Sequence, residues 1–582
     1  MNWLWDKTSL RSRYPLAVLA GLALAASFPT VGVAGLAWIA PGFMVAAALR
    51  KTGRESFRIG YMAGLAHYLA SLYWLLLIPY RWHGLPLGPA LGWVSLSAFL
   101  ALWPATWVWW VCTTAVPARL KLSSSADPLA DPAELDPGHA LRPDGLGRDV
   151  IPATWVGRTT WALGAATAWV ALEMTLARFL GGFPWNFLGD SQYQMTPIIQ
   201  IASVTGVYGV SFLMVWFALG VLCAGLTVLR HPATRSLWIA ELGLPLLAVT
   251  LVFNFGRDHL QHAPTPARSL SVTLVQPGIP QTLIWDATKN GQRFQNLLRL
   301  GEQALSNQTE VVIWPEGAIP EFLRYDEATA IALSSMARRH HVWMIVSSDD
   351  FEPRAGAAKP SEGDYFNASF LIDPEGQLTG NSYRKRNLVI FGEYVPWLRW
   401  LPFLKWFTPI QGAFTPGTTP GLFPMQGLGA TASALICFED VFPQLDWGGQ
   451  DDSVDFLVNL TNDGWFGESA EQWQHAANAL FRAVERGLPL IRCANNGITG
   501  WIDAQGRFRE IFRDAQGSPY GPGFITVQVP LPAPGEKPAQ TFYRRHGDWF
   551  GWACVGATGL MLVGILRERF KQVVSRRRRE VC

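Results

Sequence analysis

Two patterns of hydrophobic and polar positions divide the chain. From residue 14 to about residue 255, long apolar runs follow one another with short polar breaks. From residue 268 to residue 532 the apolar runs shorten to strand length and alternate with turns and amphipathic stretches. About 20 apolar residues are needed to cross a bilayer as a helix. The pattern therefore predicts a helical membrane half followed by an α/β domain.

The first half contains seven runs with the length and composition of membrane spans. They cover residues 14–29, 31–49, 57–79, 89–116, 160–180, 200–229 and 236–255. An eighth run, residues 549–566, stands alone near the C-terminus. A signal peptide is the competing interpretation of residues 1–27, but the cleavage context is weak and a second apolar run follows at once. We expect about eight transmembrane helices.

These runs predict the domain boundaries. A membrane domain is expected over residues 1–260, with residues 117–158 as a cytoplasmic insert rich in Pro, Asp and Gly. That composition predicts a loosely ordered loop without chemistry of its own. The α/β domain is expected over residues 268–532 and the last membrane helix over residues 547–567. A basic tail, residues 568–582, ends the chain.

Basic residues in the short loops predict the orientation. They follow the second, sixth and eighth runs: Arg50, Lys51, Arg54 and Arg58; Arg230 and Arg235; and Arg567, Arg569, Lys571 and Arg576, Arg577, Arg578 and Arg579. The loops after the first and fifth runs carry no Lys or Arg, and the loop after the third carries only Arg81. Both termini are therefore predicted to be cytoplasmic. The α/β domain is predicted on the opposite side of the membrane.

Composition narrows the function classes further. The net charge of +3 gives no argument for nucleic-acid binding, and 28 tryptophans favour a membrane–water boundary. The six cysteines are scattered, with no CxxC pair and no His partner at metal spacing, so we expect no disulfide framework, no metal and no cofactor. One acid, Glu173, lies inside a predicted span near Arg178. It is either functional or one half of a structural ion pair.

The second half predicts strands alternating with helices, which indicates an α/β sandwich. The predicted strands cover residues 270–275, 310–314, 342–347, 366–372, 431–436, 455–460, 488–493 and 524–529. Helices are predicted near residues 292–306, 325–340 and 471–487. Turn signals stand at residues 373–376 and 503–506.

Three residues at the ends of strand-like runs carry the candidate chemistry. Cys437 follows an apolar run, Glu316 follows another, and Lys385 lies within Tyr383-Arg384-Lys385-Arg386. A thiol needs a nearby base or cation to act as a nucleophile. Glu316 could accept the thiol proton, and Lys385 could stabilise an oxyanion. Taken alone, such a Cys is usually a core residue, such a Glu a turn residue and such a Lys a surface charge. The prediction of a catalytic site therefore depends on the three residues occurring together.

The motifs as a set resemble the Glu–Lys–Cys triad motifs of the nitrilase superfamily. Over nearly the whole chain except the insert, they resemble its integral-membrane branch, the apolipoprotein N-acyltransferases. The motifs are Trp314-Pro315-Glu316, Tyr383-Arg384-Lys385-Arg386, Ile436-Cys437-Phe438-Glu439, Phe391-Gly392-Glu393-Tyr394, Asn462-Asp463-Gly464-Trp465-Phe466-Gly467, Asn495-Asn496-Gly497 and Phe183-Pro184-Trp185. The departures from the usual motif are Phe438, Gly464 and Ile390, and they leave the triad intact.

The resemblance implies a nitrilase-like α-β-β-α sandwich and a set of roles. It implies Glu316 as general base, Lys385 as oxyanion stabiliser and Cys437 as the acyl-accepting nucleophile. It also implies that Glu393 and Glu439 assist around the thiol. Aromatic residues are implied to shape the substrate entrance: Trp285, Trp465 and Phe466. If the strand persists through Cys437, Glu439 projects to the thiol's face; if the chain turns there, that inference lapses.

The function implied is acyl transfer in a bacterial inner membrane with a periplasmic catalytic domain. An sn-1 acyl chain would pass from a phospholipid, typically phosphatidylethanolamine, through a Cys437 thioester to the α-amine of an S-diacylglyceryl cysteine on an apolipoprotein. The first alternative is a membrane-anchored amidase that uses water as acceptor. The second is a transporter or scaffold with an inactive nitrilase-like domain, which the intact triad disfavours.

Overall fold

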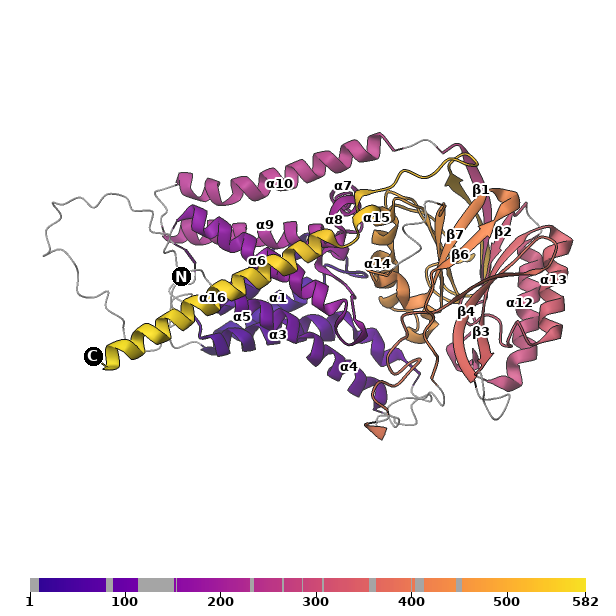
Figure 1. The fold of residues 1–582 in the computed structure, drawn as a ribbon, viewed down its shortest axis with the longest axis horizontal. Coiled ribbons are helices and arrows are strands. Elements are labelled where there is room, and N and C mark those ends of the chain that lie inside the picture. The colour runs from indigo at the N-terminus through magenta and orange to yellow at the C-terminus, as the bar shows by residue number, and fades with distance from the viewer. Residues whose placement is uncertain are drawn as a thin grey trace, which may run out of the picture.

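The structure is a computed structural model of the 582-residue chain. It describes residues 10–79, 87–113, 151–152, 154–230, 235–263, 266–284, 286–305, 308–354, 363–398, 400–402, 413–445 and 453–581. Figure 1 shows helices gathered at one end and two β-sheets at the other. Most of the predicted insert, residues 117–150, and Trp285 lie outside the described residues.

All secondary-structure elements described in the N-terminal half are helices. Its elements are α1 (Leu10–Ala25), η2 (Ala34–Trp38), α2 (Ala40–Ala48), α3 (Gly53–Ser71), η3 (Tyr73–Leu77), α4 (Gly88–Leu100), α5 (Leu102–Thr113), α6 (Trp155–Leu176), η7 (Phe179–Gly181), η8 (Leu188–Gln192), α7 (Thr196–Ile199), α8 (Ala202–Thr205), α9 (Val207–Arg230) and α10 (Arg235–Gln261). After the sheets follow α15 (Phe542–His546) and α16 (Trp549–Val581).

Among the described residues, four helices are long and apolar enough to cross a membrane. They are Gly88–Thr113, Val207–Leu229, Trp238–Gln261 and Trp549–Glu568. The second predicted span, residues 31–49, is divided into η2 and α2, and α1 is a shorter apolar helix. The helices indicate a membrane domain, and the count of eight stays a prediction.

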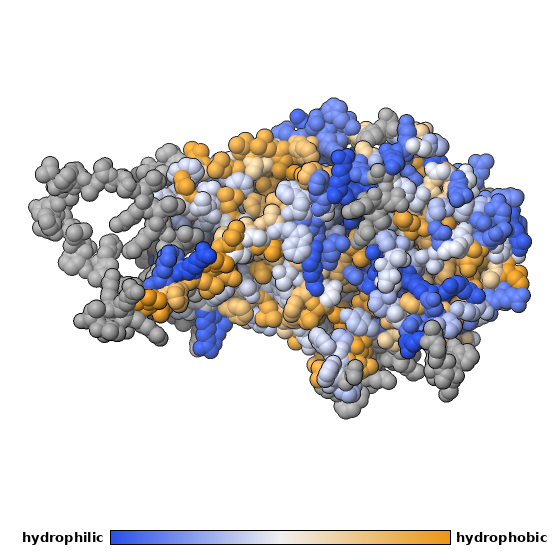
Figure 2. Space-filling model, in the orientation of Figure 1, coloured by the Kyte–Doolittle hydropathy of each residue, from blue (hydrophilic) through white to orange (hydrophobic). Residues whose placement is uncertain are grey.

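The face of the helical end seen in Figure 2 is mostly apolar, with a few hydrophilic patches. Hydrophilic residues also gather where the helices meet the sheets (Figure 2). On α16, Leu560 is 75% exposed and Leu566 is 54% exposed. Leucines so exposed on a long helix suit contact with lipid, where apolar side chains cost nothing to expose.

The second half forms two six-stranded sheets among the described residues. The first has the order β12-β1-β2-β3-β4-β5 and the second the order β11-β10-β9-β8-β7-β6. The first comprises β1 (Arg268–Gln276), β2 (Val311–Ile313), β3 (Trp343–Pro353), β4 (Gly363–Ile372), β5 (Leu378–Arg384) and β12 (Gly523–Leu531). The second comprises β6 (Gly421–Met425), β7 (Ala430–Ile436), β8 (Phe456–Thr461), β9 (Leu490–Ala494), β10 (Gly500–Ile502) and β11 (Phe508–Ile511).

Helices cover the outer faces of both sheets, which gives the expected α-β-β-α order. On the first sheet lie α12 (Asn290–Ala304) and α13 (Glu327–His340), whose Leu297, Leu333 and Met336 share a core with the sheet. On the second lies α14 (Glu471–Arg486), which separates the sheets from α8 and α15 (Figure 1). The sandwich therefore contacts the helical half in part through α14.

Glu173, the acid inside a predicted span, does not pair with Arg178. Glu173 Oε1 accepts hydrogen bonds from Trp169 Nε1 at 2.8 Å, Leu188 N at 3.0 Å and Ser211 Oγ at 3.1 Å. The Arg178 guanidinium instead pairs with Asp548, at the start of the last helix. Proximity in sequence predicted the wrong partner because α6 ends at Leu176, before Arg178.

Candidate active site

The nucleophile candidate sits at a sharp turn. β7 ends at Ile436, and Cys437 opens the 3-10 helix η12 (Cys437–Val441) with φ +55. A positive φ is uncommon for a residue with a side chain. It turns the chain at once and leaves the sulfur at the end of the strand. Because the strand stops there, strand alternation no longer places Glu439 beside the thiol.

The Lys385 ammonium lies between two carboxylates, Glu316 after β2 and Glu393 in the loop after β5. Lys385 directly follows β5 and is 1% exposed. Its Nζ lies 3.4 Å from Glu316 Oε1 and 3.0 Å from Glu393 Oε1. Asn367 on β4 binds the same two acids, since its Nδ2 lies 2.7 Å from Glu316 Oε1 and 3.0 Å from Glu393 Oε1. Asn367 and Lys385 together hold the two acids in place.

The charges around the thiol keep the lysine charged and the resting thiol neutral. Burial lowers the pKa of Lys385, but Glu393 and Glu316 outweigh it and hold the pKa well above its usual value. Burial and the Glu316 carboxylate raise the pKa of Cys437 well above its usual value, and Lys385 opposes them. The thiol therefore keeps its proton until a base removes it. Glu316 is the carboxylate that acts most strongly on it.

Glu439 binds the backbone of both loops that form the site. It is fully buried, and its oxygens accept hydrogen bonds from Arg386 N at 2.7 Å, Asn387 N at 2.9 Å and Ile436 N at 2.9 Å. The hydroxyl of Tyr383 donates a fourth hydrogen bond at 2.7 Å. Burial raises the pKa of Glu439 while these hydrogen bonds oppose the rise. Its geometry is that of a clamp between the lysine loop and the cysteine loop.

An aromatic cluster joins the cysteine turn to the helical half. The ring of Phe438 lies 5.8 Å from Phe183 and 6.0 Å from Trp185. Phe466, in η13 (Asp463–Phe466), lies 4.6 Å from Trp74 of the helical half. Trp465 lies on the same short helix. Trp285, the third predicted entrance residue, lies outside the described residues.

Some polar residues of the site were not identified from the sequence. Asn367 interrupts the buried run of β4, and Thr461 ends β8 beside Cys437. The sequence signal for both is a polar residue within, or at the end of, a buried strand. A buried polar side chain needs a hydrogen-bond partner, but the sequence does not identify that partner.

Comparison with known proteins identifies the family. The N-terminal domain of apolipoprotein N-acyltransferases matches residues 20–220, and the carbon-nitrogen hydrolase family matches residues 271–526. An apolipoprotein N-acyltransferase from Geobacter metallireducens is 34% identical over 97% of this chain and 96% of its own length. The chain belongs to the apolipoprotein N-acyltransferase family.

Other members of this family are similar over much of the chain. The apolipoprotein N-acyltransferase from Brucella melitensis is 30% identical over 90% of this chain and 86% of its own length. That from Allorhizobium ampelinum is 31% identical over 78% of this chain and 77% of its own length. A solved amidase from Nesterenkonia, of the nitrilase superfamily, covers 46% of this chain and 92% of its own length at 15% identity, with a TM-score of 0.32.

Proposed function

We propose that this chain N-acylates the N-terminal S-diacylglyceryl cysteine of apolipoproteins, using a phospholipid as the acyl donor. Phosphatidylethanolamine is the donor that we favour. The observation that carries the proposal is the position of Cys437. Its thiol lies near enough to the buried Lys385 and to Glu316 for their charges to act on it. The next residue, Phe438, contacts aromatic residues of the helical half.

In the first half-reaction, Glu316 takes the thiol proton and the Cys437 sulfur attacks the carbonyl carbon of the sn-1 ester. A sulfur–carbon bond forms, and Lys385 stabilises the charge on the carbonyl oxygen. The carbon–oxygen bond to glycerol then breaks. The glycerol oxygen receives the proton from Glu316 and leaves as the lysophospholipid.

In the second half-reaction, the α-amine of the lipoprotein attacks the thioester carbon. Glu316 accepts the proton that the amine loses, and the Cys437 thiolate leaves and is protonated again. Glu393 assists by fixing Lys385, and Glu439 assists by clamping the two loops. Trp285, Trp465 and Phe466 shape the entrance for the two lipid substrates.

The proposed location is the bacterial inner membrane. The charges of the short loops support cytoplasmic termini and a periplasmic catalytic domain over residues 268–532. The proposed membrane domain covers residues 1–260, with an eighth span over residues 547–567 and a basic tail over residues 568–582. The acyl donor would reach the thiol from the outer leaflet.

A transfer assay tests the function. The purified full chain is mixed with a phospholipid labelled in its sn-1 chain and with a synthetic diacylated lipopeptide. The label should appear as an amide on the lipopeptide, and Cys437→Ala should abolish it. Glu316→Gln and Lys385→Met should lower the rate by about a hundredfold or more. Release of free fatty acid at the same rate with or without lipopeptide would instead support the amidase.

A further inference from the structure

A closed ring of four buried charged side chains lies behind the cysteine turn. His475 Nε2 is 2.7 Å from Asp440 Oδ1, and His475 Nδ1 is 2.9 Å from Asp463 Oδ1. Arg492 closes the ring, because it pairs with the other oxygen of Asp440 and lies 3.4 Å from Asp463 Oδ2. All four side chains are at most 2% exposed. Two cations and two anions neutralise each other there.

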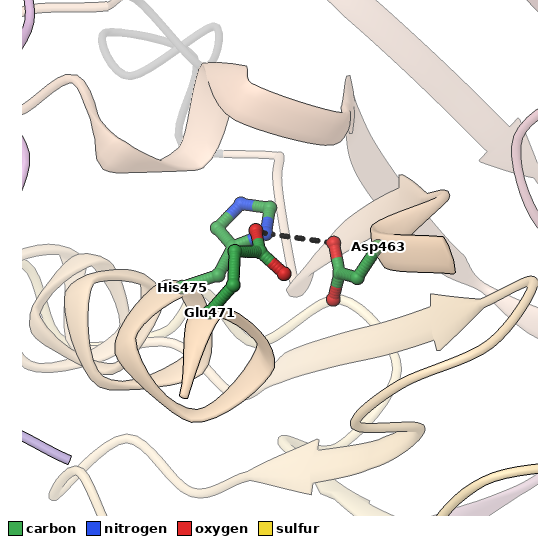
Figure 3. A group of neighbouring side chains, drawn as sticks. All are labelled: Asp463, Glu471 and His475. Atoms are coloured by element: carbon green, nitrogen blue, oxygen red, sulfur yellow. Dashed lines mark hydrogen bonds and ion pairs between the residues drawn. The ribbon is translucent and has the colours of Figure 1, made fainter. Parts of the chain in front are cut away.

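These side chains are better explained as a network of ion pairs than as a metal site. Figure 3 shows Asp463, Glu471 and His475 turned toward one another, with donor atoms that lie within 4.8 Å. Both ring nitrogens of His475 donate to carboxylates, whereas a metal needs a neutral imidazole with a free nitrogen. Burial lowers the pKa of His475, but the neighbouring Asp440 and Asp463 outweigh it and raise the pKa to about 10. Arg492 supplies the second positive charge.

Glu471 completes this picture as a neutral neighbour. Its Oε1 lies 3.8 Å from His475 Nδ1, and its Oε2 has no hydrogen-bond partner among the described residues. Burial and the Asp463 charge raise the pKa of Glu471 well above its usual value. A protonated carboxyl group keeps the cluster neutral without a further cation.

The ring reaches the nucleophile through Thr461. β7 and β8 are parallel neighbours with Ile436 opposite Leu460. Cys437 directly follows the end of β7, and Thr461 is the last residue of β8. The Thr461 hydroxyl donates to Asp463 Oδ1 at 2.9 Å and lies near enough to the Cys437 sulfur to lower the pKa of the thiol. Asp440, in turn, lies on the same short helix η12 as Cys437.

We propose that Thr461 is a positioning residue for the thiol and that the ring of Asp440, His475, Asp463 and Arg492 holds its hydroxyl in place. While the thiol is neutral, the Thr461 hydroxyl donates to Asp463. When Glu316 has taken the thiol proton, the hydroxyl turns and donates to the thiolate. Asp463 then loses the hydrogen bond from Thr461, but His475 and Arg492 still bind its carboxylate. The hydroxyl proton stays on Thr461 throughout.

The turn of the Thr461 hydroxyl toward the thiolate opposes the rise in the Cys437 pKa that burial causes. The charged groups that act on Cys437 are Glu316, Lys385 and Asp463, and two of the three oppose a thiolate. A hydrogen bond to a charged group stabilises that charged form, so it lowers the pKa of a thiol that it reaches. Removing the hydroxyl should therefore move the thiol titration upward by about one pH unit.

The test is the pH dependence of Cys437 alkylation in the purified full chain. Iodoacetamide is the probe, and mass spectrometry of the Cys437 peptide gives the rate at each pH. Thr461→Val should raise the midpoint by about one pH unit. Thr461→Ser, which keeps the hydroxyl, should restore it. The matched control is Thr526→Val, since Thr526 hydrogen-bonds Thr273 at 2.8 Å in the other sheet and should leave the midpoint unchanged.

A second variant keeps the test decisive. If Thr461→Val does not fold, Thr461→Ala should show the same upward shift without adding bulk. His475→Gln should shift the midpoint in the same direction by loosening Asp463. A midpoint unchanged in Thr461→Val or Thr461→Ala, or a shift as large in Thr526→Val, overturns the proposal. The inference rests on Cys437 being the nucleophile, but alkylation needs no lipid, so its failure is distinct from a failure of acyl transfer.

Discussion

Asn367 shows how one uncharged side chain can organise a charged site. Its side-chain amide nitrogen donates to both Glu316 and Glu393. The backbone carbonyl oxygen of the same residue accepts from the backbone N–H of Lys385 at 2.8 Å. Two carboxylates that share one ammonium repel each other unless further donors hold them. The single neutral donor group between them keeps Glu316 oriented without adding charge. Asn367 thus fixes Glu316, the proposed base, and the Lys385 ammonium at once.

We predict that Asn367→Asp lowers the acyl-transfer rate about a hundredfold, the scale expected for a misplaced general base. The change keeps the shape but replaces a donor with a third carboxylate. The control is Asn381→Asp on the same sheet, where the side chain donates to Leu422 O at 3.0 Å and makes no other hydrogen bond to the described residues. Rates within twofold of each other for the two variants would contradict this role.

At the scale of elements, α14 connects the two halves of the molecule. Its Gln474 accepts hydrogen bonds from Trp74 Nε1 at 3.1 Å and Trp185 Nε1 at 2.9 Å. The same side chain donates to Pro29 O at 2.9 Å and Ser71 O at 3.1 Å. One buried amide therefore binds three separate segments of the helical half. The helix carrying it also carries His475 of the charged ring.

We predict that Gln474→Ala lowers the apparent melting temperature of the detergent-solubilised protein by about 5 °C, because two buried indole donors lose their acceptor. Gln528→Ala is the control, since Gln528 is exposed on β12. Scanning fluorimetry gives both values. Equal melting temperatures for the two variants would show that Gln474 does not stabilise the junction.

The hydrophobic pattern predicted the longer strands of the two sheets and missed three edge strands and one short buried strand. All eight predicted strands are present, and the turn signal at residues 373–376 separates β4 from β5. The missed strands are β5, which reads LTGNSYR, β6, which contains a proline, and the short β10 and β11. β5, β6 and β11 lie at sheet edges and lack a continuous apolar run, and β10 is buried but only three residues long. Likewise, motifs located Glu316, Lys385 and Cys437, but Asn367 and Thr461 act through contacts that only the fold creates.

At the scale of the whole molecule, the helical end and the sandwich lie in one line, with the C-terminal end of α16 far from the sheets (Figure 1). The basic loops predict that this end faces the cytoplasm. The aromatic cluster around Phe438 then lies where the sandwich meets the helices, which suits a substrate held in the bilayer. Orientation thus connects the chemistry to its lipid substrates.

We predict that a membrane-impermeant maleimide labels Glu375→Cys from the periplasmic side of intact spheroplasts. Lys571→Cys should react only after the cells are opened. Both side chains are exposed, at the sandwich and on α16 respectively, so accessibility alone does not separate them. A parent carrying Cys582→Ser gives the background. The reverse pattern of labelling would contradict the proposed orientation.

The central claim is that Cys437 carries a lipid's acyl chain, and mass spectrometry of the full chain purified from membranes tests it most directly. The account predicts a fatty acyl thioester on the Cys437 peptide, which hydroxylamine removes and which the diacylated lipopeptide discharges faster than water does. Cys437→Ala should carry no acyl group and transfer none. A variant without Cys437 that retained full transfer activity would contradict the account.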